Sequence, residues 1–422
     1  MPDDGSVQLA AVIGIDWADE KHDVALQEAG SDRIERKVLR HTPESISEWV
    51  AELRERFSGR RVGIALETSR GPLVNALLDY DFLVLYPVNP RSLKRFREAF
   101  YPSGAKDDIP DADLLRELLL KHRERLHAWV PDDVETRALR RLVQNRRKTV
   151  ELRTKLSQQL RAVLKEYFPL ALSLLGDDLS SVLACDFLLN WPTLEKLQRV
   201  RPKTLRKFFY DHNSRSAEQI ERRIQEIQAA KPLTTDSAII DTGALMAQML
   251  AAQLKALAPS IARFDKEIET RFSAHGDAAL FKSLPGSGQA LAPRLLTIFG
   301  SDRERFRSAD EVQLVTGIAP VTERSGKRSF VHWRRRAPVF VRQSVHEFAQ
   351  HSTLHCPWAK AYYQLQVSRG KGHHAAVRAL AFKWLRIIWR CWKDRVSYDD
   401  ALYTAALIRR GSPVGLALQR AA

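Results

Sequence analysis

Three short runs of apolar, often β-branched residues in the first 130 positions constrain the fold more than any other feature of the chain. They read LAAVIGID at 9–16, RVGIALE at 61–67 and DFLVLYPV at 81–88, and a shorter alternating stretch lies at 23–27. The segment 69–80, between the second and third runs, is predicted to be a helix. Short β runs that alternate with helices are typical of an α/β domain whose sheet is covered on both faces.

Periodic apolar stripes predict long helices beyond the Pro-Asp-Asp at 131–133, which ends the first domain and suits a helix start. Leucines recur every four residues from Leu152 onward, and apolar residues alternate spacings of four and three from Leu250 to Ile268. The second pattern is that of a coiled-coil seam, and Pro259 inside it predicts a kink. A packed helical bundle and a protruding coiled coil, used for dimerisation or nucleic-acid contact, both satisfy these stripes.

We therefore expect three sections: an α/β domain at 1–130, a helical coiled-coil section at 131–276 and a mainly α-helical domain at 277–422. Within the last section, SLPGSGQALAPRLLTIF at 283–299 looks like a helix, a tight glycine turn and a second helix. Such a turn can present backbone N–H groups to a phosphate, as in helix-hairpin-helix DNA contacts. A plain turn between two helices explains the segment equally well. It is not a P-loop, because no Lys-Ser or Lys-Thr follows the glycines.

The basic charge of the chain is unevenly distributed over its 422 residues, whose formal net charge is +16. Residues 1–130 contain 19 Lys and Arg against 23 Asp and Glu, a net charge of −4. Residues 137–165 contain 10 against 1 and residues 321–393 contain 15 against 2, which gives +9 and +13. Two such surfaces predict a polyanionic partner, DNA or RNA, with Arg146 and Arg147 among the candidate contacts. Solubility or an acidic protein partner is the alternative.

The chain offers no sequence evidence for a membrane or for export. Its apolar runs are too short to span a bilayer, and it opens with no export-signal pattern. Cys185, Cys356 and Cys391 stand far apart and form no CxxC pair. We expect a cytoplasmic protein without membrane partners, in which each cysteine is a small core residue.

Four aspartates crowd SGAKDDIPDADLL at 103–115 in a chain that is otherwise basic. Asp108 and Asp111 are three residues apart and would share one face of a helix. Asp16 and Glu67 end the first two apolar runs, and strand ends at one edge of a sheet lie close together. Two Mg²⁺ or Mn²⁺ ions, about 3.5–4 Å apart, would neutralise four such carboxylates and support phosphodiester cleavage.

Helix capping explains the same aspartates without a metal. Asp108 would be the N-cap, Pro110 would lie in the first turn, and Asp111 would fall at N3 near the positive end of the helix dipole. The two interpretations are compatible, because a metal-binding aspartate can also open a helix. Asp107 and Asp113 are spare carboxylates that could substitute as ligands.

Several motifs, in this order, resemble the DEDD transposases of bacterial insertion sequences. The resemblance covers both ends of the chain, although the middle section looks long for that family. It implies an N-terminal domain of the RuvC or RNase H type and a C-terminal transposase domain. It assigns Asp16, Glu67, Asp108 and Asp111 as ligands of Mg²⁺ or Mn²⁺, with two ions expected. The matching pieces are GIDWADEKHDVAL, ALETSRG, YPVNPRSLKRF, GAKDDIPDADLL and the segment from LPGSGQALAPRLLTIF to TERSGKRS.

The resemblance also implies a serine nucleophile, which in this sequence is Ser325, and a covalent phosphoserine intermediate. It implies donor and target DNA, a structured guide RNA encoded by the element, and a bacterial, nucleoid-associated location. It further implies a dimer, and a tetramer on DNA, in which the carboxylates of one subunit meet the serine of another. No Ser-His-Asp arrangement is evident, although His332 is nearby. The basic residues around the serine that could hold phosphates are Arg324, Lys327, Arg328, Arg334, Arg335 and Arg336.

Three other functions stay open on the sequence. A metal-dependent nuclease or junction resolvase would use the same four carboxylates with water as the nucleophile. A non-catalytic nucleic-acid-binding protein would need the aspartates only for helix capping. An ATPase related to actin and the sugar kinases shares the GIDW-type first strand but does not explain the charge of 321–393.

Overall fold

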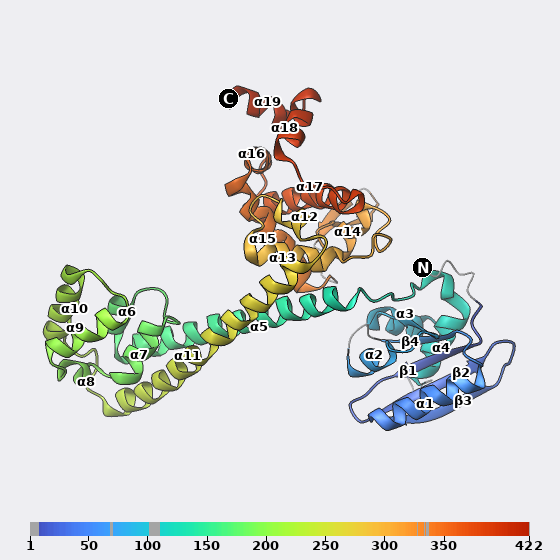
Figure 1. Cartoon of the computed structure of the whole chain (residues 1–422), viewed down its shortest axis with the longest axis horizontal. Helices are drawn as coiled ribbons and strands as arrows, with labels where there is room; N and C mark the ends of the chain where they lie inside the picture. The colour runs from blue at the N-terminus through green and yellow to red at the C-terminus, as the bar shows by residue number, and fades with distance from the viewer. Residues whose placement is uncertain are drawn as a thin grey trace. The chain divides into compact units, whose positions relative to one another are not determined.

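The computed structural model describes residues 8–67, 71–100, 110–326, 328–332, 334 and 337–421 (Figure 1). The chain divides into two compact units, 1–132 and 133–422. Each unit has hydrophobic cores of its own. None of the helices in the described ranges is both long and apolar enough to cross a membrane.

The first unit is a five-stranded sheet with helices on both faces. The strand order is β3-β2-β1-β4-β5. β1, β4 and β5 pair in parallel, and β2 pairs antiparallel with both of its neighbours, β1 and β3. Its strands are β1 (Ala11–Asp16), β2 (Lys21–Glu28), β3 (Ile34–Arg40), β4 (Val62–Leu66) and β5 (Leu83–Pro87). Its helices are α1 (Pro43–Arg56), α2 (Pro72–Leu77), α3 (Pro90–Phe100), α4 (Asp111–His122) and the short 3₁₀ turn η1 (Arg123–Arg125).

Side-chain alternation along the strands divides this unit into two cores. Ile13 and Ile15 of β1 pack with Trp49 and Val50 of α1 on one face. On the other face, Ala65 of β4 packs with leucines of α4. The predicted α/β domain, with a sheet covered on both faces, is therefore confirmed. The sequence reading missed β3 and α1, since β3 (IERKVLR) is an edge strand with largely exposed side chains.

The glycine at position 14 lets α4 lie directly on β1. A Cβ atom there would fall 2.5 Å from the backbone nitrogen of Arg116 and closer still to the carbonyl oxygen of Ala112. Both of these atoms are backbone, so neither can turn aside as the end of a side chain could. Any larger residue would push the first turn of α4 off the sheet.

The second unit contains two long helices, α5 and α11, which pack side by side along much of their length (Figure 1). The helices between them form one core with the adjoining ends of α5 and α11, and the helices that follow form another. The first group is α5 (Val134–Tyr167), α6 (Pro169–Leu175), α7 (Val182–Asn190), α8 (Leu194–Gln198), α9 (Pro202–Asp211), α10 (Ala217–Ala229) and α11 (Ser237–Ala274). The second is α12 (Ala278–Lys282), α13 (Gly288–Phe299), α14 (Ala309–Val315), β6 (Val321–Ser325), β7 (Arg328–His332), α15 (Val339–His355), α16 (Pro357–Ser368), α17 (His373–Asp394), α18 (Asp400–Arg409) and α19 (Pro413–Ala421).

The two predicted apolar stripes are packed mostly within the chain. Leu250 and Leu254 of α11 lie in the same core as Leu156 of α5, whereas Leu152 is exposed. Helix α11 runs through Pro259 as one continuous element, so the predicted kink does not interrupt it. The three-section division stays a prediction, as does the coiled-coil character of α5 and α11.

Large aromatic side chains fill the core of the C-terminal helices. Trp358, Trp384 and Trp392 are fully buried, as expected for most tryptophans of this region. Cys185 and Cys356 are buried and Cys391 is partly buried, and all three are free thiols. Burial raises the pKa of the Cys356 thiol to about 12, so it is an inert core residue at neutral pH.

Gly14→Ala should lower the free energy of unfolding by about 3 kcal/mol, because the added methyl group overlaps backbone atoms of α4. Gly63→Ala on β4 is the matched control, since its methyl group would meet flexible ends of Leu9 and Leu119 and should cost about 1 kcal/mol or less. Urea unfolding followed by circular dichroism measures both. Equal losses in the two variants would contradict the backbone-contact argument.

Candidate active site

Two of the predicted carboxylates lie together at the carboxyl-terminal edge of the sheet. Asp16 is the last residue of β1, and Glu67 directly follows β4. The strands are parallel neighbours with Ile15 opposite Leu66, so Asp16 and Glu67 occupy adjacent positions. Since Ile15 and Leu66 belong to the α1-side core, both carboxylates are on the face covered by α4.

A third predicted carboxylate, Asp111, comes from the start of α4. It is the first helical residue and forms an ion pair with Arg97 of α3. The packing of α4 onto Gly14 brings this end of the helix to the strand that carries Asp16. Arg97 thus pairs with Asp111, and its charge also acts on Asp16 and Glu67; sequence reasoning missed this residue.

Burial and like charge disfavour ionisation of the two strand-end carboxylates. Burial raises the pKa of Asp16, the charge of Asp23 raises it further, and Arg97 lowers it. Burial likewise raises the pKa of Glu67, followed by the charge of Asp16, and again Arg97 lowers it. An added cation at this edge would relieve the repulsion.

The fourth predicted ligand, Asp108, lies outside the described residues, as does Asp107. The proposed cap is wrong in its register: α4 begins at Asp111 with Pro110 as its N-cap, so Asp111 is the first helical residue and not N3. Proline cannot cap through its side chain, and the helix instead has Asp111 and Asp113 in its first turn.

Asp113 has a structural role and is not a spare ligand. Its side chain is 4% exposed and accepts hydrogen bonds from Nε and Nη2 of Arg36, at 3.0 and 3.1 Å. Arg116 lies near the same carboxylate, at 3.9 Å, and also bonds to Gln27. The bidentate pair of Arg36 and Asp113 ties α4 to β3, and the bond between Arg116 and Gln27 ties it to β2.

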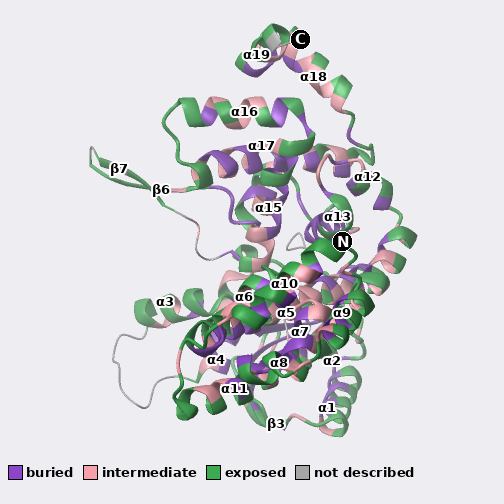
Figure 2. Ribbon diagram, turned by 90° about the vertical axis from the view of Figure 1, so that its left-hand side faces the viewer, coloured by how far each residue is buried: buried purple, intermediate pink, exposed green. Residues whose placement is uncertain are grey.

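The predicted nucleophile Ser325 lies at the tip of a two-stranded hairpin in the second unit. It is the last residue of β6 and pairs with Arg328 of β7, and Gly326 turns the chain with a φ of +56°. Figure 2 shows this hairpin as largely exposed. Glycine is suited to that left-handed turn and leaves the backbone beside Ser325 open to a nucleic acid.

The nearest histidine in sequence does not activate the serine. His332 pairs with Glu323 at 3.4 Å, and both side chains are more than half exposed. Strand alternation places Glu323 and Ser325 on one face of the hairpin and Arg324 on the other. His332, on the strand opposite Ser325, therefore has a partner of its own in Glu323.

The basic residues around Ser325 are only partly described. Arg324 and Arg328 are exposed, whereas the side chain of Arg334 is half-buried and donates to the carbonyl of Ala319 at 3.4 Å. Arg324 and Arg328 are thus free to face a polyanion. Outside the described residues are Lys327, Arg335 and Arg336.

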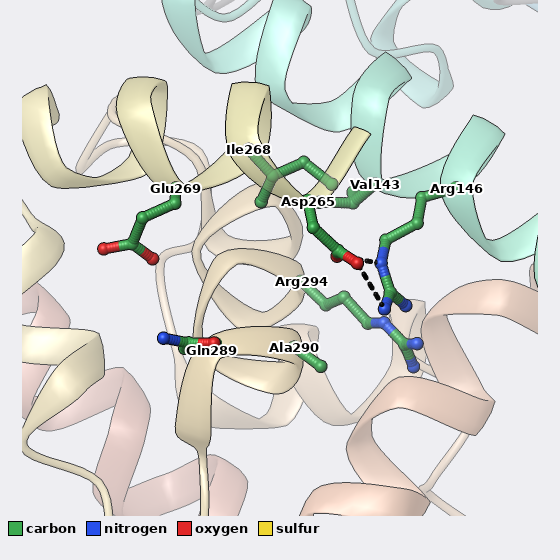
Figure 3. A pocket seen from close by; sticks show the side chains of 8 residues that line it. All are labelled: Val143, Arg146, Asp265, Ile268, Glu269, Gln289, Ala290 and Arg294. Carbon is green, nitrogen blue, oxygen red and sulfur yellow. Dashed lines mark hydrogen bonds and ion pairs between the residues drawn. The ribbon is translucent and has the colours of Figure 1, made fainter. Parts of the chain in front are cut away.

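Arg146 and Arg147 of α5 are paired inside the protein. Arg146 pairs with Asp265 of α11, as the dashed lines in Figure 3 mark. Arg147 bonds to Glu347 of α15 at 3.1 Å, and the buried Arg294 bonds to the same carboxylate at 2.7 Å. These ion pairs join α5, α11, α13 and α15. Acidic partners within the protein therefore compensate much of the positive charge of these arginines.

The predicted glycine turn joins α12 to α13 with a φ of +79° at Gly286 and +51° at Gly288. The hydroxyl of Ser287 donates to the carbonyl of Phe281 at 3.0 Å and does not cap α13. A Cβ at Gly286 would lie 3.0 Å from the backbone of His351, so the turn packs closely on α15. The predicted turn and second helix are confirmed, but the first helix lies before Ser283, and phosphate binding at the turn stays a prediction.

The described residues at the sheet edge suit a hard divalent cation in their chemistry. Asp16 and Glu67 supply oxygen donors, and burial, followed by like charge, raises the pKa of each carboxyl. Across the described ranges, however, no group of three or more His, Cys, Asp or Glu side chains is arranged to hold a metal ion. Asp111 is engaged by Arg97, and Asp108 would have to complete the set.

Comparison with known proteins places both candidate sites in matched segments. A family model described as a transposase matches residues 13–169, and one described as the transposase IS116/IS110/IS902 family matches residues 278–364. A protein assigned as the mini-circle transposase for IS117 in Streptomyces coelicolor is 27% identical over 410 residues, 95% of this chain and 98% of that protein. An uncharacterized 42 kDa protein of insertion element IS900 from Mycobacterium paratuberculosis is 35% identical over 158 residues, 37% of this chain and 40% of that protein.

Asp16→Asn should leave stability equal to or above that of the unchanged protein in metal-free buffer at pH 7. The raised folded-state pKa of Asp16 means that its stability contribution is fully present at low pH and is lost as pH rises through that pKa. Asp113→Asn is the matched contrast and should cost about 2 kcal/mol, because it breaks a pair whose acid is buried. Urea unfolding between pH 4 and about pH 8 measures both. Destabilisation by Asp16→Asn that grows with pH would contradict this assignment.

Proposed function

The chain belongs to the IS116/IS110/IS902 family of transposases, and from that premise we propose that it cleaves and rejoins DNA strands through Ser325 with help from the carboxylates of the first unit. The observation that carries the proposal is the gathering of Asp16, Glu67 and Asp111 at one sheet edge. Asp113 in this unit is held by Arg36 in a bidentate pair, whereas Asp16 and Glu67 lie close together and each is affected by like charge.

In the proposed reaction, the hydroxyl oxygen of Ser325 attacks the scissile phosphorus and forms a phosphoserine ester. The bond from phosphorus to one sugar oxygen breaks, the hydroxyl proton is lost to a base, and the leaving oxygen takes up a proton. Attack by a sugar hydroxyl on the phosphoserine reverses the process and frees the serine. One phosphoester bond replaces another at each step, so rejoining needs no ATP.

A divalent cation is proposed as the cofactor, with Asp16, Glu67 and Asp108 as its holders and Asp111 joining them. When bound, it would polarise the scissile phosphate and stabilise the leaving oxygen. The chain's own residues supply the rest: Arg324 and Arg328 beside Ser325 would hold neighbouring phosphates. Magnesium fits this role, since its preferred ligands are carboxylate oxygens and phosphates.

The proposed nucleic-acid partners are donor and target DNA and a structured guide RNA. The support is the charge of 321–393, with 15 Lys and Arg against 2 Asp and Glu, and the exposure of Arg324 and Arg328. Arg146 and Arg147 are weaker candidates than the sequence suggested, because they are paired with Asp265 and Glu347. Binding through so many cations should be strongly salt-dependent.

Self-association is proposed through the outer face of α11. Leu245, Met246 and Met249 are exposed there, although the opposite face of this part of the helix is buried in the core. Leu245 and Met246 precede Met249 by four and three residues, so the three side chains share one face of the helix, as in a helix that packs on another helix. A second copy of the chain presents the same apolar stripe and so matches it.

Ser325→Ala should abolish a covalent protein–DNA adduct, and Asp16→Asn should abolish it too. The assay mixes full-length protein, co-expressed with the flanking RNA of its element, with end-labelled donor DNA and Mg²⁺ on a denaturing gel. Thr322→Ala is the matched control, because it removes a hydroxyl from the same strand and should keep the adduct.

Strand cleavage without an adduct, unaffected by Ser325→Ala but lost in Asp16→Asn, would contradict the serine mechanism. That result would identify a hydrolytic nuclease or junction resolvase that uses water at the same carboxylates. Unchanged DNA processing in both variants would show that neither Ser325 nor Asp16 is catalytic.

Leu245→Asp should shift the protein to a smaller assembly, because a charge in an apolar helix interface is costly to bury. Leu233→Asp is the matched control, since Leu233 is also exposed, at 61%, but precedes α11. Sedimentation velocity at several protein concentrations measures the assembly. An unchanged distribution in Leu245→Asp would exclude this face as the interface.

A further inference from the structure

Arg97 is the cation that faces the carboxylates of the candidate active site. It forms an ion pair with Asp111, and its positive charge also acts on Asp16 and Glu67. The charge of one α3 side chain therefore acts on three carboxylates: one at the end of β1, one just after β4 and one at the start of α4. Arg97 thus supplies positive charge to carboxylates that a divalent cation would also neutralise.

Arg97 contacts its carboxylate differently from Arg36, a structural arginine of the same unit. Arg36 grips Asp113 with Nε and Nη2 together. Arg97 meets Asp111 through Nη2, and its Nε is buried with no hydrogen-bond partner among the described residues. A guanidinium that contacts a carboxylate through one nitrogen is held less firmly than one that contacts it through two. It is therefore easier to displace.

We propose that Arg97 is the resident counter-ion of the carboxylate site and that a divalent cation must displace it from Asp111 in order to bind. This inference rests on the proposed function, because it takes Asp16, Glu67 and Asp111 as metal ligands. Arg97 is a positioning residue: it holds the acids together before the metal arrives. Its displaced guanidinium, still tethered to α3 beside the site, is then available to a DNA phosphate.

The test is a Mn²⁺ titration of metal-free, full-length protein, with free Mn²⁺ followed by electron paramagnetic resonance. Arg97→Gln should bind Mn²⁺ about threefold or more tightly than the unchanged protein, because the competing charge is gone. Arg95→Gln is the matched control, since it removes one positive charge from an exposed position of the same helix and should change the affinity little. Arg97→Lys keeps the charge but loses the fork and should give an intermediate affinity.

Equal or weaker Mn²⁺ binding by Arg97→Gln, with Arg95→Gln unchanged, would overturn the inference. If Arg97→Gln does not fold, Arg97→Lys decides: binding no tighter than that of the unchanged protein would overturn it. Asp16→Asn separates this failure from that of the proposed function. Saturable Mn²⁺ binding that Asp16→Asn abolishes supports the metal site whatever Arg97 does, whereas no Mn²⁺ binding in the unchanged protein would overturn both proposals.

Discussion

The contact of α4 with the backbone of β1 at Gly14 determines the geometry of the whole first unit. Without a side chain at that position, the first turn of α4 rests on the strand itself. The helix then buries its leucines on the α4-side core and brings Asp111 to the edge where β1 and β4 end. Asp113 and Arg36 secure the same turn from the side of β3. The contact at Gly14 therefore both stabilises the unit and positions Asp111, a candidate functional acid.

The central strands could be predicted from the sequence because their burial requires a continuous run of apolar residues. β1 and β4 are covered on both faces, so they read as continuous apolar runs, and their ends are marked by Asp16 and Glu67. β3 could not be found in this way: four of its seven residues are charged, and its position is fixed by pairing with β2. The register of α4 was misjudged by two residues, since the sequence made Asp108 the cap and the structure makes it Pro110.

Arg97 illustrates what sequence patterns leave out of a site. It is one of several basic residues in PRSLKRFREAF, and nothing in that segment distinguishes it from Arg95. Its importance comes from the packing of α3 beside α4, which brings it to Asp111. Arg146 and Arg147 show the converse limit of composition, although their contact with nucleic acid stays a prediction. Local composition made them part of a nucleic-acid surface, but acids more than 100 positions away in sequence, Asp265 and Glu347, neutralise them in the fold.

Under the proposed function, the two halves of the chemistry belong to different compact units. The carboxylates are built into a rigid sheet edge, whereas Ser325 is at the tip of a two-stranded hairpin, a kind of element that has little stability of its own. The hairpin also exposes Phe330 and Val331, at 52% and 68%, and within the described residues it offers the serine no base. A nucleophile presented in this way stays weak until a nucleic acid or another subunit orders the hairpin and supplies the missing activation. Under the proposed function, strand cleavage would then depend on assembly with DNA or with another subunit.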